Sequence, residues 1–307
     1  MIKKDPKINK KSILNPKILL ICNKGSLANG VFQELKNYFE VQVLNLHIKS
    51  KINLIIEEID HQINYFKINL VVFISGETRN ENYMIKANEK IPFKIATICS
   101  KKSIPLVYLS SLSVFGIPKK NIINNSSSRN PINLYGITKN NLDNQINTHL
   151  PNLNYCCIAP GSIINPLSKN NNLVDMGLNY FSKSPIIFLL KFIAPAGNYA
   201  CVHIDDLIRI ISRECIAILN ADKSVPYRIF KNCTTKISIY ELIKIANGFK
   251  PFIKLASIPI KFINLISIIL PSNIILRIIV YFVDIEYLSE YDFLKKRPLK
   301  DYLKDNY

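Results

Sequence analysis

Glycine is scarce in this chain, with 9 residues among 307, and tryptophan is absent. The 9 glycines and 16 prolines are too few for a linker or scaffold. This composition indicates a folded, enzyme-sized protein. The 7 cysteines form an odd number without any CxxC spacing. They therefore predict neither a disulfide framework nor a zinc site, no metal is expected, and a reducing cytoplasm is favoured.

A long uninterrupted apolar segment is also missing. Residues 1–16 are basic and polar, and no extended apolar core of a signal peptide follows them. The most apolar region, Phe262–Val283, is broken by Pro271-Ser272-Asn273 and by Arg277. A membrane-spanning helix needs about 20 mainly apolar residues, so we expect two amphipathic helices that meet at Pro271-Ser272. Peripheral contact with a membrane surface stays open.

Acidic residues are few, since 22 Asp and Glu stand against 40 Lys and Arg, and the net charge is +18. One interpretation is a surface for nucleic acid, anionic lipid or phosphorylated substrates. The other is the compositional drift of an AT-rich genome, whose codons favour Ile, Lys and Asn throughout. Because the basic residues are spread along the chain, drift is favoured and nucleic acid is not expected as a partner. A diffuse positive field would still help to capture a diphosphate substrate.

The chain is long enough, and at 48% hydrophobic residues apolar enough, for a large α/β domain with a smaller lobe. Alternating strands and helices predict right-handed βαβ units and a Rossmann-like, doubly wound parallel sheet. We expect a basic extension at 1–16, a dinucleotide-binding domain at 17–160, and a mainly helical C-terminal substrate lobe at 161–307, partly interleaved with the sheet. The expected strands are 17–22, 41–44, 68–74, 106–110 and 155–158, and the expected helices begin near 27 and cover 49–66, 81–100 and 132–150.

The pair Tyr135 and Lys139 carries the chemistry that the sequence predicts. Four residues apart, the two side chains share one face of a helix. A cation beside a phenol favours the phenolate and lowers the tyrosine pKa toward the range useful for acid–base catalysis. Upstream, the apolar run 106–110 ends in hydroxyls, and Ser111 is placed to share a hydrogen bond with the oxygen on which Tyr135 acts. The alternative interpretation is a surface tyrosine beside an ordinary lysine, since Tyr-x-x-x-Lys alone is common.

The turn after the first expected strand is a weaker signal. A pyrophosphate-binding turn uses three glycines, and here the three positions are Cys22, Gly25 and Ala28. Only the middle glycine is present, so this turn by itself does not predict a dinucleotide site.

Taken together, the motifs resemble the extended short-chain dehydrogenase/reductase family, which includes NAD-dependent sugar-nucleotide epimerases, dehydratases and reductases. The resemblance covers nearly the whole chain and rests on Cys22–Ala28, Phe73–Gly76, Asn88, Leu109–Gly116, Tyr135–Lys139, Ala159–Gly161, Val202–Asp206 and Asp284–Leu303.

The resemblance implies Tyr135 as general acid/base, Lys139 as the residue that holds the nicotinamide ribose, and Ser111 as the group that orients the sugar oxygen. Residues implied for NAD or NADP are Cys22, Gly25, Ser26, Leu27, Asn45, Ser75, Gly76, Asn88, Tyr135, Lys139 and Pro160, and those implied for a nucleotide-sugar are Ser111, Ser113 and Arg297. Asn45 stands where an aspartate would mark NAD, so the choice between NAD and NADP stays open. A homodimer is expected by analogy.

The residues after Ser111 narrow the reaction. Family dehydratases and decarboxylases carry carboxylates there, whereas this chain has Leu112 and Ser113. We therefore expect an epimerase or a 4-ketoreductase that acts on a nucleotide-linked hexose, in surface polysaccharide or sugar-nucleotide biosynthesis. Cys22 and Asn45 depart from the family pattern, so the alternative is a non-catalytic Rossmann-fold protein for binding or assembly, associated with nucleic acid or membrane.

Two tempting clusters receive structural interpretations. His203 with Asp205 and Asp206 resembles a metal site, but aspartates at a helix start explain the pattern. Adjacent Cys156 and Cys157 are interpreted as core packing rather than as nucleophiles.

Overall fold

The computed structural model describes residues 15–165, 193–222, 224–241, 244, 253–291 and 294. The chain forms two compact units, and each is assembled from separate stretches. The first unit comprises 1–111, 137–159 and 208–231, and the second comprises 112–136, 160–207 and 232–307. One crossing between the units falls between Ala159 and Pro160, one residue before the boundary expected between 160 and 161. Of the expected extension, residues 1–14 lie outside the described residues.

A six-stranded sheet forms the centre of the first unit, in the order β10-β6-β4-β3-β1-β2. All pairings from β2 across to β6 are parallel. The central strands read as continuous apolar runs because helices cover both faces of a parallel sheet. The strands are β1 (Lys17–Cys22), β2 (Glu40–Asn45), β3 (Leu70–Phe73), β4 (Leu106–Leu109), β6 (Tyr155–Pro160) and β10 (Arg228–Cys233).

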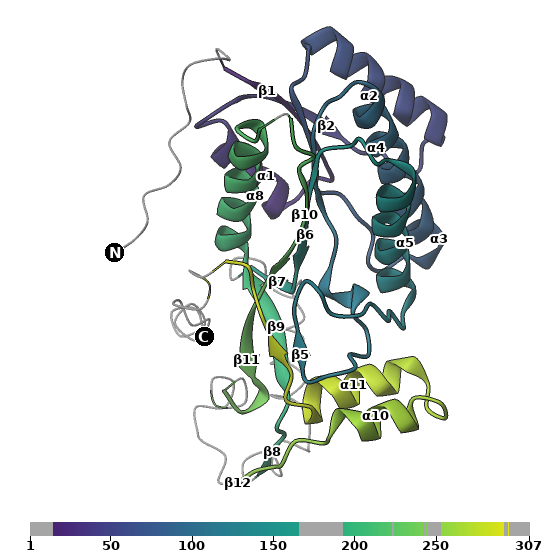
Figure 1. Ribbon diagram of the computed structural model, residues 1–307, viewed down its shortest axis with the longest axis vertical. Coiled ribbons are helices and arrows are strands. Elements are labelled where there is room, and N and C mark those ends of the chain that lie inside the picture. Colours follow the sequence, from purple (N-terminus) through teal and green to yellow (C-terminus); the bar gives the residue numbers. More distant parts are fainter. Residues whose placement is uncertain are drawn as a thin grey trace. The chain divides into compact units, whose positions relative to one another are not determined.

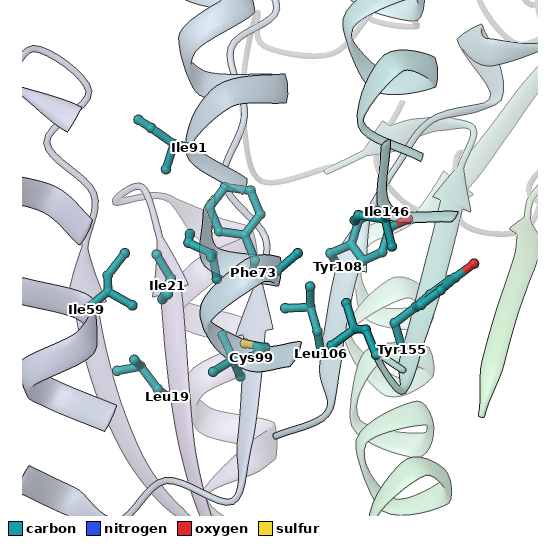
Figure 2. Packing of buried hydrophobic residues seen from close by; sticks show 14 of the residues in the cluster. Leu19, Ile21, Ile59, Phe73, Ile91, Cys99, Leu106, Tyr108, Ile146 and Tyr155 are labelled. Carbon is teal, nitrogen blue, oxygen red and sulfur yellow. The ribbon is translucent and has the colours of Figure 1, made fainter. Parts of the chain in front are cut away.

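Helices α1 and α8 lie on one face of this sheet, and α2, α4 and α5 lie on the other (Figure 1). On the second face the side chains form one apolar cluster, which includes Ile59, Phe73 and Ile146 (Figure 2). The predicted doubly wound α/β fold is thus confirmed. The helices are α1 (Ser26–Leu35), α2 (Ile52–Phe66), α3 (Glu81–Ile85), α4 (Ile91–Lys101), α5 (Leu134–His149) and α8 (Ile204–Leu219).

The order of the strands determines where a ligand can bind. From β1 the chain passes through α1 to β2 on one side, and then through α2 to β3 on the other side of β1. The direction of winding therefore reverses between β1 and β3. In open α/β sheets, ligands bind outside the carboxyl ends of the strands at such a switch point.

The expected helix over 81–100 departs from regular α geometry. Between α3 and α4 the segment Lys86–Lys90 forms a π-helical turn. Pro92 has no N–H to donate to the carbonyl of Asn88, four residues earlier, so the α-helical ladder cannot continue unbroken through this point. Turns of this kind occur frequently at functional sites.

The second unit contains small sheets and a helical hairpin. Strand β9 pairs in parallel with β7 and antiparallel with β11. The two amphipathic helices predicted on either side of Pro271-Ser272 are confirmed as α10 and α11. No helix among the described residues is long and apolar enough to cross a membrane. The elements are η2 (Leu112–Val114), β5 (Ile122–Ile123), β7 (Ser162–Ile164), β8 (Ile193–Ala194), β9 (Asn198–His203), β11 (Thr235–Ser238), β12 (Ile253–Lys254), α10 (Ile260–Ile266), α11 (Ser272–Phe282) and β13 (Glu286–Tyr287).

Candidate active site

The loops at the switch point carry polar atoms without partners. Asn23, directly after β1, and Ser75, shortly after β3, each bury a side-chain oxygen that forms no hydrogen bond within the described part of the chain. An unsatisfied buried polar atom costs about 1–3 kcal/mol, so such atoms are rare unless a ligand satisfies them. Ser75 is among the residues that the family resemblance implies for the cofactor. Asn23 was not expected there, and its position after an apolar run is its only signal in the sequence.

The N-terminus of α1 faces the same switch point. Gly25 precedes the helix, no side chain caps it, and its first turn contains no acidic residue. A Cβ atom placed on Gly25 would meet no heavy atom within 4 Å, so the backbone is open to an approaching group. The free N–H groups of Ser26 and Leu27 and the helix dipole suit a diphosphate.

Cys22 and Asn45 flank this turn. Cys22 is the last residue of β1, is 2% exposed, and stands beside Asn45 of β2 in the parallel register. Burial raises the pKa of the Cys22 thiol, so at neutral pH it is an uncharged apolar side chain. The exposed Asn45 lies at the carboxyl end of β2, and Lys49 and Lys51 follow it, also exposed. These residues therefore fit the adenosine end of a dinucleotide.

Asn88 connects the switch-point loop to α5. Its Oδ1 accepts from the backbone N–H of Glu77 at 2.8 Å, and its Nδ2 donates to the Glu77 carbonyl at 2.8 Å. The same Nδ2 also lies 3.3 Å from Thr138 Oγ1 on α5. Asn88 was expected to bind the cofactor. In the structure its side chain is engaged in holding the loop after Gly76 against α5.

Lys139 is a buried lysine of the site with a lowered pKa. It is 2% exposed, and its Nζ donates to the carbonyl of Leu109, the last residue of β4, at 2.9 Å. Burial lowers its pKa from 10.5 to about 8, and the nearby Asp143 partly opposes that shift. A Cβ on Gly76 would lie 3.5 Å from this Nζ. The ammonium is thus brought close to the loop after β3.

Asp143, one turn after Lys139, is a buried carboxylate that the sequence analysis missed. It is 1% exposed and accepts from the Tyr108 hydroxyl at 3.0 Å and from the Ser110 hydroxyl at 2.8 Å. Its spacing of four residues from Lys139 was the only signal in the sequence, and four-residue pairs are common on helices. Its negative charge favours the charged form of Lys139.

Tyr135 lies in the first turn of α5, one turn before Lys139 on the same continuous helix. The start of that helix is tightly held. Asn133 Oδ1 accepts from the backbone N–H of Gly136 at 2.7 Å, as an N-cap does. A Cβ on Gly136 would lie 2.4 Å from the carbonyl oxygen of Ser113, so only glycine allows this close approach.

The remaining expected site residues lie at strand ends or outside the described residues. Ser111 lies two residues after the end of β4 and is 7% exposed, and Pro160 ends β6. Arg297 lies outside the described residues. The helix-start interpretation of Asp205 and Asp206 is confirmed, because both lie in the first turn of α8. Within the described residues, no group of three or more His, Cys, Asp or Glu side chains is arranged to hold a metal ion.

Fold and site together define the class of protein. The parallel sheet, the uncapped helix after β1 and the unsatisfied atoms at the switch point are those of a Rossmann-like α/β protein with a dinucleotide-type site. Residues 17–159 match the family model described as RmlD substrate binding domain. The match covers just under half of the chain, and it agrees with the resemblance to the extended short-chain dehydrogenase/reductase family that the motifs indicate. No curated protein matches the chain.

Solved structures share the fold at low sequence identity. The dTDP-4-dehydrorhamnose reductase of Yersinia enterocolitica has 19% identity and a TM-score of 0.62, with 95% of this chain and 98% of that chain covered. The enzyme WbmG of Bordetella bronchiseptica in complex with NAD has 12% identity and a TM-score of 0.63, with 98% and 94% covered. The dTDP-4-dehydrorhamnose reductase of Bacillus anthracis in complex with NADP has 13% identity and a TM-score of 0.58, with 79% and 84% covered.

Proposed function

We propose that the protein is a nicotinamide-dependent enzyme that reduces or epimerises a nucleotide-linked sugar. The observation that carries the proposal is Lys139, a buried lysine with a pKa lowered to about 8, one helical turn after Tyr135. A buried lysine with a perturbed pKa, in the unit that holds the switch-point loops, is typical of a catalytic site. The unsatisfied oxygens of Asn23 and Ser75 and the open N-terminus of α1 support a dinucleotide there.

Each residue has a distinct part in this chemistry. The loops that carry Asn23, Gly25 and Ser75 would hold a dinucleotide, whose nicotinamide would supply or accept the hydride at the sugar carbon. Tyr135 donates a proton from its phenol to the sugar oxygen during reduction and takes one back during oxidation. The Lys139 ammonium stabilises the phenolate that remains, and the Ser111 hydroxyl donates a hydrogen bond to the same sugar oxygen. The ketone thus gains one hydride and one proton to become an alcohol.

The residues after β4 limit the reaction to simple hydride transfer. Leu112 and Ser113 offer no carboxylate that could remove a second proton, so elimination of water and decarboxylation are disfavoured. The similarity of the fold to dTDP-4-dehydrorhamnose reductases supports a ketoreductase. An epimerase needs the same residues and differs only in returning the hydride to the opposite face of the sugar.

Cofactor and assembly follow as narrower proposals. The neutral Asn45 and the exposed Lys49 and Lys51 favour NADP, because they can accommodate a 2′-phosphate. A homodimer, a cytoplasmic location and a role in surface polysaccharide or sugar-nucleotide biosynthesis stay predictions that rest on the family resemblance.

The first test is chromatography of the nucleotide that the purified protein releases on heat denaturation, followed by turnover with a nucleotide-linked 4-keto sugar. Stoichiometric NAD without net consumption of NADPH would identify an epimerase. A protein that purifies empty and consumes NADPH with the keto sugar would be the reductase. A protein that binds neither NAD(H) nor NADP(H) would overturn the proposal and favour the non-catalytic alternative.

A matched pair of variants tests the role of Tyr135. Tyr135→Phe removes the proton donor, and turnover falls by about 10²- to 10⁴-fold while the fold is retained. Tyr65→Phe alters a tyrosine on α2 that is 70% exposed, and it leaves turnover unchanged. Equal turnover in both variants would remove Tyr135 from the mechanism.

A further inference from the structure

The hairpin of α10 and α11 exposes large apolar side chains on its outer side, next to the exposed polar Lys261 and Asn264. The inner side chains, including Ile263, Ile275 and Ile279, are buried in the second unit. A surface helix normally turns charged and polar residues outward. Here the outward residues include Phe262 at 54% exposure, Leu265 at 63%, Ile268 and Ile269 at 82% each, and Ile274 at 42%.

Helices α10 and α11 lie side by side and are joined by a short connection (Figure 1). Ile268 and Ile269 stand in that connection, between the end of α10 and the start of α11. They are the most exposed large apolar side chains among the described residues. Contiguous exposed apolar residues of this kind mark a surface that contacts a partner or a membrane.

The charge around the hairpin identifies the kind of partner. Between Glu241 and Asp284 the sequence contains no acidic residue. Lys261 is exposed on α10 beside Phe262. The whole chain carries a net charge of +18. An apolar surface inside an acid-free, basic stretch is complementary to anionic lipid headgroups above a hydrocarbon layer. The basic residues of the stretch are Lys244, Lys250, Lys254, Lys261 and Arg277.

We propose that the hairpin, defined as residues 260–282, docks the protein on an anionic lipid bilayer. Ile268 and Ile269 enter the boundary between headgroups and acyl chains, and Lys261 faces the headgroups. Neither helix is long enough to span the bilayer, so the contact is interfacial. This attachment is independent of the enzymatic activity proposed above.

A second copy of the chain fits this surface less well. In a symmetric dimer the same patch faces itself, so each residue of one copy meets the corresponding region of the other. Two basic stretches would then approach each other, and neither would contribute a carboxylate between Glu241 and Asp284 to offset the repulsion. An anionic membrane removes that repulsion and also covers the exposed isoleucines.

Sedimentation of the full chain with lipid vesicles tests the proposal. We expect binding to phosphatidylcholine vesicles that contain phosphatidylglycerol, and little binding to pure phosphatidylcholine. The double variant Ile268→Ser/Ile269→Ser weakens binding by on the order of tenfold, because the apolar area that enters the lipid is lost. Lys261→Glu weakens it by about fivefold or more, since each basic residue near an anionic surface contributes about 1 kcal/mol.

The matched control is Leu54→Ser/Tyr65→Ser on α2, which removes side chains that are 57% and 70% exposed in the first unit. This control binds vesicles as the unmodified chain does, and circular dichroism verifies that every variant is folded. Absence of vesicle binding, or equal binding by both double variants, would overturn the proposal. So would light scattering that shows a dimer which only the Ile268→Ser/Ile269→Ser variant loses, because the second copy would then be the occupant.

Discussion

Two buried carboxylates lie on opposite faces of the central sheet, and the residues around them are of similar types. Asp143 on α5 lies 3.6 Å from the sulfur of Cys157, and Glu214 on α8 lies 3.4 Å from the sulfur of Cys156. Adjacent residues of β6 point to opposite faces, so each cysteine meets the helix that covers its own side. Each carboxylate is 1% exposed, and each has a tyrosine and a lysine nearby.

The difference lies in what each lysine contacts. Lys231 is 24% exposed and donates to both oxygens of Glu214, at 2.9 and 2.8 Å. Lys139 is buried and donates to a backbone carbonyl, while hydroxyl groups satisfy Asp143. The Glu214 cluster is therefore a structural ion pair. The Asp143 cluster contains a buried ammonium of lowered pKa, one helical turn after Tyr135. Under the proposed function, similar residues therefore serve stability on one face of the sheet and chemistry on the other.

The largest expected difference between the faces is in turnover. Lys139→Met removes the ammonium beside Tyr135 and should lower kcat/KM by about 10²- to 10⁴-fold. Lys231→Met, on the other face, should change kcat/KM by no more than about twofold. A tenfold change would correspond to about 1.4 kcal/mol of activation free energy. Steady-state assays with the keto sugar measure both. Similar losses in the two variants would erase the distinction between a catalytic and a structural lysine.

Stability should show the reverse order. Lys231→Met leaves Glu214 buried without its cation and should lower the free energy of unfolding by about 1–3 kcal/mol, a value reduced because Lys231 is partly exposed. Lys139→Met removes a buried charge and should leave the protein as stable or make it more stable. Urea unfolding measures the two changes, and a larger loss for Lys139→Met would contradict the comparison.

The dependence of kcat/KM on pH should follow the protonation of Lys139. Because the pKa of Lys139 is lowered to about 8, its ammonium is lost as the pH rises through that value, and kcat/KM falls on the alkaline side. The unfolded lysine keeps its proton up to about 10.5, so this group also stabilises the fold progressively as the pH rises from about 8 to 10.5.

Asp143→Asn removes the charge that raises the pKa of Lys139. The alkaline limb of the kcat/KM profile should therefore move to lower pH in this variant. Glu214→Gln is the matched control and should leave the limb in place. An unmoved limb in Asp143→Asn would show that Asp143 only fills space. Return of the limb to its original pH in Asp143→Glu would support the electrostatic role of Asp143.

The smallest effects should come from the adjacent cysteines. Burial raises the pKa of the Cys156 thiol well above its ordinary value, and neither sulfur acts as a nucleophile in the proposed chemistry. Cys156→Ala and Cys157→Ala should each change the free energy of unfolding by about 1 kcal/mol and leave turnover unchanged. Rapid thiol labelling of the native protein at either position would contradict their burial.

Features with a local periodic signal were predictable from the sequence. Apolar runs such as 17–22 and 106–110 predicted β1 and β4, and helical spacing predicted α2 and α5. The residues Pro271-Ser272 predicted the break between α10 and α11. The Tyr135 and Lys139 pair was found because four-residue spacing on a helix is visible in the sequence. The turn after β1 was a weak signal in the sequence, and the open backbone at Gly25 strengthens it.

Features that depend on contacts between distant segments were not predictable. Nothing local indicates that Asn88 holds Glu77 against Thr138, or that Asn23 buries an unsatisfied oxygen. The π turn was missed as well, although Pro92 provides a physical reason for it.

The sequence by itself determined the alternation of strands and helices and the types of residue available for chemistry, because both follow from side-chain periodicity along the chain. Only the tertiary structure decided that Lys139 is buried whereas Lys231 stays partly exposed to solvent. It also decided that Cys156 and Cys157 contact different carboxylates. Burial and pKa depend on which helix covers which face of the sheet. That arrangement arises from packing between segments far apart in the sequence, such as β4 with α5 and β6 with α8.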